Sequence, residues 1–160
     1  MSARFEHQWN EQTGSVRRLS VTLESRVESA DIAESLILEF SGKAGCDGRQ
    51  MEEIGLAVRE SVANAVCHGN RCDLTKKVVM TAEFRHPELV IRIRDEGEGF
   101  DPEVLADPLL PDNLLHESGR GFFLMKTCMD DVTVRRIGPR GVELTMIKHV
   151  FKAPHRRILK

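Results

Sequence analysis

The sequence contains no run of apolar residues that approaches the roughly 18 needed to span a bilayer. Its first residues, 1–8, also lack the apolar centre of a signal peptide. These two absences argue against the membrane classes, and we expect a cytoplasmic protein. Internal repeats, low-complexity tracts and long linkers are absent as well, so the 160 residues predict one domain with a full core.

The sequence also lacks a large net charge and a metal-binding pattern of cysteines. A formal net charge of −2 lacks the basicity of a nucleic-acid-binding protein, so we expect no direct contact with nucleic acid. The four cysteines, Cys46, Cys67, Cys72 and Cys128, are predicted to be free thiols. Cys67 with His68 and Cys72 does not have the spacing of a zinc finger or ribbon, which argues against a zinc site.

The first half of the chain predicts a strand and two helices. Alternation indicates a strand over residues 16–23, and a helical period follows over 26–42, ending at Gly42 and Gly45. A second helix is predicted over 47–70, where Asp47 and Gln50 have the spacing of a capping box. The predicted core stripes are Val27, Ala30, Ala33, Ile37 and Phe40 on the first helix, and Met51, Ile54, Val58, Val62 and Ala65 on the second.

The second half predicts two hairpins around one more helix. Strands are expected over 77–84 and 89–94, a helix over 119–129, and strands over 132–137 and 142–151. Residues 101–118 carry three of the six prolines without a period, which is typical of a functional loop. Strands joined by hairpins and covered by helices on one face make an α+β sandwich with a mixed, mainly antiparallel sheet.

Three short motifs carry the chemistry, and the first lies on the second predicted helix. Glu60, Asn64 and His68 have i, i+4, i+8 spacing and so line one face beside the core stripe. Mg²⁺ takes hard oxygen ligands, and the amide of Asn64 can supply one. Glu60, one turn earlier, could take a proton from an attacking hydroxyl or water near a terminal phosphate. Two solvated polar residues on a helix are the ordinary alternative.

The second motif, Asp95-Glu-Gly97-Glu-Gly99-Phe100, follows a predicted strand. Two glycines spaced by one residue let the backbone approach a flat ligand closely. Asp95 could accept a hydrogen bond from the exocyclic amine of adenine, which would discriminate adenine from guanine. The ordinary alternative is an acidic turn at a strand end.

The third motif, Gly119-Arg120-Gly121, opens the last predicted helix. Free amides at a helix N-terminus bind phosphate, and Arg120 adds a positive charge. The pattern matches neither the P-loop nor the Gly-x-Gly-x-x-Gly of dinucleotide folds. The alternative is a flexible helix start.

The three motifs together, in this order, resemble the N, G1 and G2 boxes of the GHKL (histidine-kinase-like) ATPase superfamily, whose adenine-binding fold is the Bergerat type. Within it, residues 16–150 resemble the anti-sigma-factor serine/threonine kinases. The helix sequence Ala57 to Gly69 and the stretch Met129-Asp-Asp-Val132 carry this closer resemblance.

The resemblance implies ATP and Mg²⁺ as cofactors and a role for each site residue. Glu60 would be the general base and Asn64 the magnesium ligand, and Asp95 would hold adenine. Gly97, Gly99, Phe100 and His68 would belong to the nucleotide pocket, and Gly119, Arg120 and Gly121 would serve the phosphates. It also implies a sigma factor and a STAS-type anti-anti-sigma protein as partners, and a homodimer. We expect an N-terminal extension over 1–15, the ATPase domain over 16–151 and a basic tail over 152–160.

One departure and three alternatives remain at this point. Many members have threonine after the glycine of the last strand, where this chain has Val142, so one nucleotide contact is in doubt. A non-catalytic ATP-binding module that sequesters a partner is the main alternative. A histidine kinase fragment is disfavoured because no acceptor-histidine helix pair precedes the domain. A gyrase-like ATPase is disfavoured because no transducer domain follows residue 151.

Overall fold

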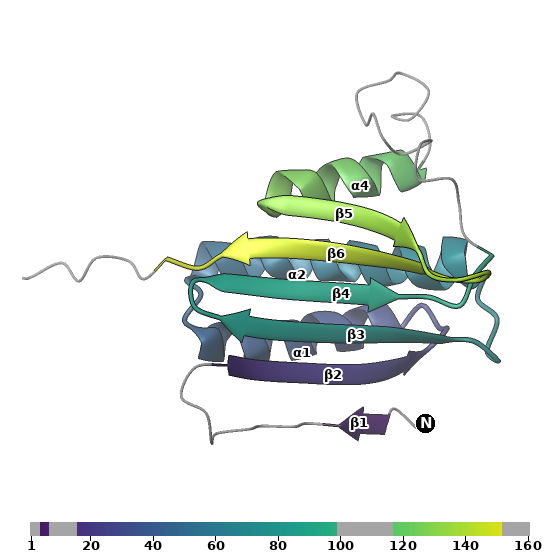
Figure 1. The fold of residues 1–160 in the computed structure, drawn as a ribbon, viewed down its shortest axis with the longest axis horizontal. Helices are drawn as coiled ribbons and strands as arrows, with labels where there is room; N and C mark the ends of the chain where they lie inside the picture. The colour runs from purple at the N-terminus through teal and green to yellow at the C-terminus, as the bar shows by residue number, and fades with distance from the viewer. Residues whose placement is uncertain (1–3, 7–15, 99–116, 152–160) are drawn as a thin grey trace, which may run out of the picture.

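The computed structural model describes residues 4–6, 16–98 and 117–151. In the described residues, six strands form one antiparallel sheet in the order β1-β2-β3-β4-β6-β5. Figure 1 shows this sheet as one continuous layer. The strands are β1 (Arg4–Glu6), β2 (Val16–Glu24), β3 (Lys77–Arg85), β4 (Glu88–Arg94), β5 (Asp131–Arg136) and β6 (Val142–His149).

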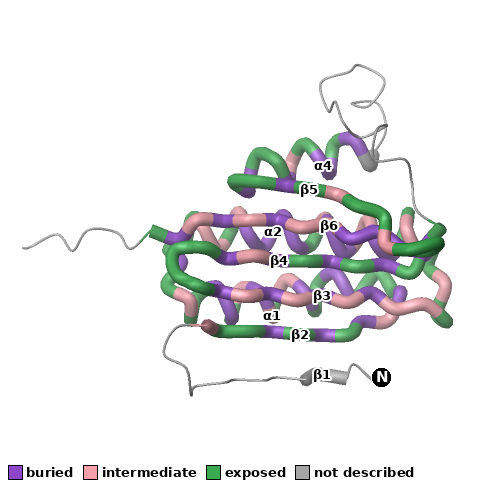
Figure 2. Tube along the Cα trace, viewed as in Figure 1, coloured by how far each residue is buried: buried purple, intermediate pink, exposed green. Residues whose placement is uncertain are grey.

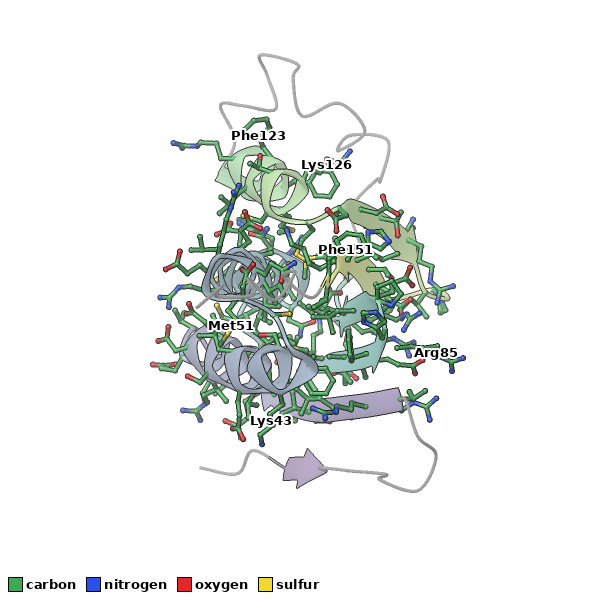
Figure 3. All side chains as sticks on the ribbon, turned by 90° about the vertical axis from the view of Figure 1, so that its left-hand side faces the viewer. Lys43, Met51, Arg85, Phe123, Lys126 and Phe151 are labelled. Carbon is green, nitrogen blue, oxygen red and sulfur yellow. The ribbon has the colours of Figure 1, made fainter. Side chains whose placement is uncertain are left out.

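The helices form a second layer on one face of the sheet, as Figures 1 and 3 show. They are α1 (Ser29–Ala44), α2 (Gly48–Asn64), the π-helical turn η1 (Ala65–Gly69) and α4 (Glu117–Cys128). Met51 lies between α1 and α2, whereas Arg85 points away from the helices (Figure 3). Within the described ranges, no helix is long and apolar enough to cross a membrane.

One antiparallel sheet with helices on one face confirms the α+β sandwich expected from the sequence.

Alternation along the strands explains why the helices cover only one face. In β3 every second residue is buried, because successive side chains of a strand point to opposite faces. The side chains on the opposite face are mostly polar and intermediate in exposure. Figure 2 shows this as purple (buried) and pink (intermediate) segments that alternate along the strand. The largest fully buried side chains include Leu23, Ile37, Ile54, Met80, Leu89, Ile91, Met125 and Met146, which come from both layers.

The ends of the first two helices agree with the sequence in part. Asp47 and Gln50 form the predicted capping box, in which the Asp47 carboxylate accepts from the Gln50 amide at 2.8 Å. Gly45 ends α1 in the left-handed conformation at φ 95°. The helix passes through Gly42, so the prediction that Gly42 also ends it was wrong.

Val27 was wrongly assigned to the core. Its side chain is 63% exposed, and it precedes α1 in a turn that connects the helix to β2. β1 was not predicted either. It pairs with β2, opposing Phe5 to Val21, and so adds an edge strand to the sheet.

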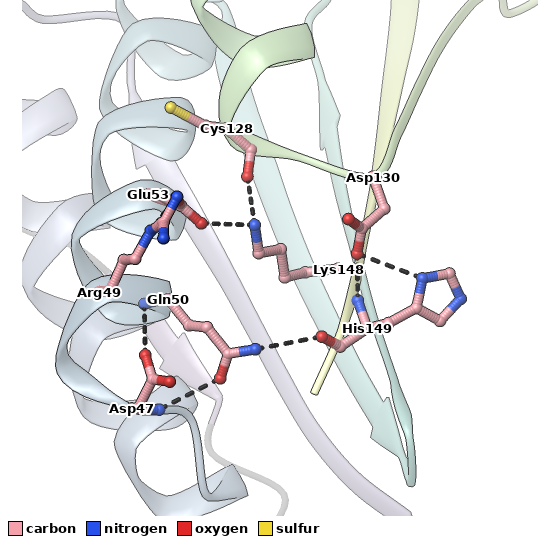
Figure 4. Close-up of polar contacts among 8 residues, drawn as sticks. All are labelled: Asp47, Arg49, Gln50, Glu53, Cys128, Asp130, Lys148 and His149. Atoms are coloured by element: carbon pink, nitrogen blue, oxygen red, sulfur yellow. Dashed lines mark hydrogen bonds and ion pairs between the residues drawn. The ribbon is translucent and has the colours of Figure 1, made fainter. Parts of the chain in front are cut away.

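A polar cluster ties α2, α4 and β6 together at the end of the sheet near residue 149 (Figure 4). The Lys148 ammonium, which is largely buried, donates to the Glu53 carboxylate at 2.6 Å and to the Cys128 carbonyl at 2.5 Å. The side-chain Nε2 of Gln50 donates to the main-chain carbonyl of His149 at 3.2 Å. The carbonyl of Cys128 belongs to the last turn of α4, where carbonyls lack partners within the helix. Lys148 therefore anchors the C-terminal end of α4.

Glu53 is the acidic partner in this cluster, and its pKa is lowered. The hydrogen bond from Lys148 is the main cause, and Arg49 adds a smaller effect. A lowered carboxyl pKa stabilises the fold above the ordinary value of 4.5. That contribution is lost as the pH falls through the lower folded-state pKa.

We predict that Lys148→Met lowers the free energy of unfolding at pH 7 by about 1–3 kcal/mol, because two acceptors lose their donor. Arg49→Met is the matched control, since it removes a more exposed partner of the same carboxylate and should cost about 0.5 kcal/mol or less. Urea denaturation at pH 7 and pH 4 measures both. The Lys148 variant should also lose part of the acid sensitivity, and equal losses for the two variants would contradict the anchoring role.

Candidate active site

Helix α2 places Glu60 and Asn64 one turn apart on the same side of the helix. Both residues are intermediate in exposure, and the helix buries Ile54, Val58 and Val62 on its core side. The predicted polar face of the helix is therefore present, with an acid and an amide accessible next to the core.

The face changes direction after Asn64, because α2 continues as the π-helical turn η1. The Asn70 amide donates to the Ala65 carbonyl at 2.8 Å, a five-residue spacing instead of four. A π-turn holds more residues than an α-turn, so His68 no longer follows Asn64 in α-helical register. His68 is exposed on this turn. The i, i+4, i+8 alignment assumed from the sequence therefore holds only for Glu60 and Asn64.

Asp95 lies at the end of β4, and its side chain is buried. One carboxylate oxygen, Oδ1, accepts from the Gly97 amide at 3.0 Å and from the Val142 amide at 3.2 Å. Within the described part of the chain, Oδ2 has no hydrogen-bond donor. Burial raises the pKa of Asp95, while the amides of Gly97 and Val142 and the charge of Lys76 act in the opposite direction. The residue thus presents one free acceptor oxygen in a site of low solvation.

Gly69 and Gly97 pack tightly around this carboxylate. A Cβ added at Gly69 would lie 2.6 Å from Cγ of Asp95, and one added at Gly97 would lie 2.5 Å from the carbonyl carbon of Gly69. Such distances leave no room for any side chain, so the end of η1 and the turn after β4 are in backbone contact. The glycine of the first motif therefore supports the aspartate of the second.

Asn70 joins the same two segments and was not identified from the sequence as a site residue. It is fully buried, and its Nδ2 donates to Ser25 Oγ at 2.7 Å and to the Lys77 carbonyl at 2.9 Å. Its Oδ1 accepts from the Glu96 amide at 2.8 Å. Asn70 thereby uses its side-chain amide to link β3 and the residue after β2 to the residue that follows Asp95. Its place in the sequence, directly after Gly69 at a predicted helix end, indicated only a helix stop.

The strands β5 and β6 hold the other side of the turn. The Gly141 amide donates to the Gly97 carbonyl at 2.6 Å, and Arg136 donates to the Glu98 carbonyl at 2.9 Å. The main chain of Val142, the position where threonine was expected, makes two hydrogen bonds with Asp95: its carbonyl accepts from the Asp95 amide at 3.1 Å, and its amide donates to the Asp95 carboxylate at 3.2 Å. Its contribution to the aspartate is therefore a backbone contribution, which valine makes as well as threonine.

The third motif meets the first at the start of α4. Gly121 is buried against Glu60, and a Cβ there would lie 2.8 Å from Cδ of the glutamate. α4 begins at Glu117, two residues earlier than predicted, so Gly119 and Arg120 lie within its first turns. Gly119 is buried and belongs to the turn whose amides lack partners within the helix, whereas Arg120 is exposed. Gly99 and Phe100, also predicted for the site, lie outside the described residues.

The described residues thus place a carboxylate, an amide oxygen and a helix N-terminus on one side, and a buried carboxylate acceptor in a glycine-lined turn on the other. A free acceptor oxygen suits an amine donor such as that of adenine. Helix amides suit a phosphate, and an amide oxygen suits Mg²⁺. This donor set fits a magnesium–nucleotide complex.

Comparisons with known proteins agree with this description. A family model described as "Histidine kinase-like ATPase domain" matches residues 23–148. The chain is 35% identical over 126 residues to an anti-sigma F factor of Clostridium perfringens, a match that covers 78% of this chain and 90% of that protein. It is 34% identical over 134 residues to the serine-protein kinase RsbW of Staphylococcus epidermidis, a match that covers 78% of this chain and 83% of that protein.

A solved structure supports the fold. The crystal structure of the RsbU and RsbW domains of a Mycobacterium tuberculosis protein superimposes with a TM-score of 0.61 at 18% identity. The match covers 82% of this chain and 31% of that longer chain.

The chain belongs to the histidine kinase-like ATPase family. Within that family it belongs to the branch of anti-sigma-factor serine/threonine kinases, and it is an enzyme of the protein kinase class.

We predict that Gly69→Ala weakens the binding of a non-hydrolysable ATP analogue with Mg²⁺ by at least about tenfold, which is 1.4 kcal/mol. The new methyl group would displace the Asp95 carboxylate from the amides that orient it. Gly48→Ala is the control, because nothing lies within 4 Å of its added Cβ. Titration calorimetry measures both variants. Unchanged affinity in Gly69→Ala would show that the aspartate does not bind the nucleotide.

Proposed function

We propose that this chain is a Mg-ATP-dependent serine/threonine protein kinase that also binds and inhibits a sigma factor. Its phosphoryl acceptor is a hydroxyl of a small anti-anti-sigma protein of the STAS type. The relatives named anti-sigma F factor and serine-protein kinase support both halves of this proposal. The proposal includes a homodimer, as the family resemblance implies, and a cytoplasmic site of action, where these partners occur.

The contact between Glu60 and Gly121 is the observation that carries the proposal. It brings a carboxylate to the N-terminal end of α4, where the helix amides would bind phosphate oxygens. A site that only binds nucleotide has no need of a base at its phosphate end. The arrangement therefore favours phosphoryl transfer over a purely regulatory pocket.

Each residue has a distinct part in the proposed mechanism. Asp95 Oδ2 would accept from the adenine amine, and Gly69 and Gly97 would shape the pocket around it. The amide oxygen of Asn64 would hold Mg²⁺, and Gly119 and Arg120 would contribute an amide and a charge to the phosphates. Mg-ATP supplies the phosphoryl group when bound.

Glu60 would accept the proton of the attacking hydroxyl as its oxygen bonds to the γ-phosphorus, while the bond from that phosphorus to the bridging oxygen breaks and ADP leaves. Most of the rate enhancement in such a transfer comes from positioning and charge neutralisation, and the base contributes the remainder.

The decisive experiment is capture of partners from the source cell's lysate in Mg-ATP and separately in Mg-ADP, with intact-mass analysis. A sigma factor retained with ATP, together with a small STAS-type protein that gains one phosphate, is the expected result. Retention of a sigma factor without any mass gain on a partner would favour the non-catalytic binding module instead.

We predict that Glu60→Ala abolishes phosphorylation of the partner, with a loss of at least about 100-fold, but spares ATP binding. Glu52→Ala, an exposed position two turns earlier on the same helix, is the control. Single-turnover transfer from radiolabelled ATP gives the rate, and calorimetry gives the affinity. If Glu60→Ala kept the full transfer rate, the residue would not be the base.

Asn64→Ala should lose the magnesium-dependent part of the nucleotide affinity, because it removes the side-chain oxygen proposed as the metal ligand. The affinity for the ATP analogue is measured with Mg²⁺ and with a chelator present. Asn64→Asp retains an oxygen and should keep the dependence on the metal. Equal magnesium dependence in the wild type and Asn64→Ala would remove Asn64 from the metal site.

A further inference from the structure

Two of the four cysteines lie together beside the nucleotide site. Cys67 is part of η1, and Cys72 is the third residue after the end of this turn. Both thiols are exposed, whereas Cys46 and Cys128 are buried. The pair therefore has access to solutes that the other cysteines lack.

Backbone geometry brings these two cysteines together. The Cys72 amide donates to the Val66 carbonyl at 2.8 Å, which folds the chain back onto the last turn of the helix. Arg71 and Cys72 are the only described non-glycine residues with positive φ, at 54° and 56°. Two consecutive left-handed residues make a tight reversal, which places Cys72 beside the turn that carries Cys67, and the Cys72 thiol acts across it to raise the pKa of Cys67.

The same reversal contains the residues that support Asp95. Gly69 and Asn70 lie between the two cysteines, and both contact the turn that carries the aspartate. The backbone contact of Gly69 with Asp95 and Gly97 leaves no space for adjustment. A change in the separation of the two sulfurs therefore displaces the segment against the adenine side of the site.

We propose that Cys67 and Cys72 form a reversible disulfide on exposure to peroxide, and that this bond weakens nucleotide binding by displacing Gly69 and Asn70. A disulfide needs a sulfur–sulfur separation of about 2.05 Å, which is shorter than any contact between two thiols, so bond formation pulls the two ends of the reversal together. The effect on nucleotide rests on the proposed function, whereas formation of the bond does not.

The chemistry balances with peroxide as the oxidant. The sulfur of Cys72 attacks a peroxide oxygen, the oxygen–oxygen bond breaks, and a sulfenic acid and one water result. The sulfur of Cys67 then attacks the sulfenic sulfur, and a second water leaves with the Cys67 proton. Two thiols lose two electrons, and hydrogen peroxide is reduced to two waters.

The order of attack follows from the environment of Cys67. Although the residue is exposed, partial removal of its thiol from water is the main factor that raises its pKa, and the neighbouring Cys72 thiol raises it further. The raised pKa lowers the thiolate fraction of Cys67, so we assign the first attack on peroxide to the Cys72 sulfur. Cys67 then acts as the resolving thiol.

The test uses the full chain, reduced and then treated with hydrogen peroxide, quenched with catalase, denatured, alkylated and digested with trypsin without reductant. Cleavage after Arg59, Arg71 and Lys76 separates the cysteines. The expected product is peptide 60–71 joined to peptide 72–76. In parallel, the affinity for the ATP analogue should fall by at least about fivefold on oxidation and recover with dithiothreitol.

Cys72→Ser should bind the analogue normally, and its affinity should no longer fall on treatment with peroxide. Cys46→Ala, the control, should lose affinity on treatment with peroxide as the wild type does. Absence of the cross-linked peptides after oxidation, or a cross-link without any loss of affinity, would overturn the proposal. If the reduced wild-type protein did not bind the analogue, the proposed function would be refuted instead. The cross-linked peptides would then still test whether the two cysteines form a disulfide.

Discussion

Burial of the Asp95 carboxylate is the constraint on which the organisation of the site depends. A carboxylate removed from water is unfavourable unless hydrogen bonds replace its hydration, and here the amides of Gly97 and Val142 do so for one oxygen. Those amides must stay in place, so the turn after β4 is fixed from several directions. The remaining oxygen keeps its acceptor capacity for a ligand.

The supports of this turn come from every part of the chain that reaches this end of the sheet. Asn70 reaches it from the residue after η1, Gly141 and Val142 from the start of β6 and the residue before it, and Arg136 from β5. The Glu96 carboxylate in turn accepts from the Lys77 amide at 2.5 Å. Because these bonds join segments far apart in the sequence, the site forms only when the whole sheet has formed. Folding and assembly of the candidate site are therefore coupled.

Elements with a strong period could be predicted from the sequence, and so could most of the candidate site. The hairpins, the capped helix α2 and the pairing of Glu60 with Asn64 all follow from local spacing. Val27 was misplaced because one apolar residue in register cannot show where a helix begins. The π-turn was missed because the residues 65–69 fit an α-helix equally well, and only the tertiary contact of Gly69 with Asp95 distinguishes the two.

Asn70 could not be found from local spacing for a related reason. Its role depends on partners at positions 25, 77 and 96, which are remote in sequence and meet only in the folded sheet. The same holds for Lys148, whose position in a strand gives no indication that it binds a helix end.

The anchoring of α4 by Lys148 has a mechanical consequence. The helix is bound firmly at its C-terminal end, whereas its N-terminal end meets Glu60, a flexible side chain. Its 12 residues make a rod about 18 Å long. A rotation of 10° about the anchored end moves the other end by about 3 Å. Gly119, about 13 Å from Cys128, would move by about 2 Å, so the anchor at Cys128 and the packing of Phe122 and Met125 in the core together fix the position of the amides at the start of the helix.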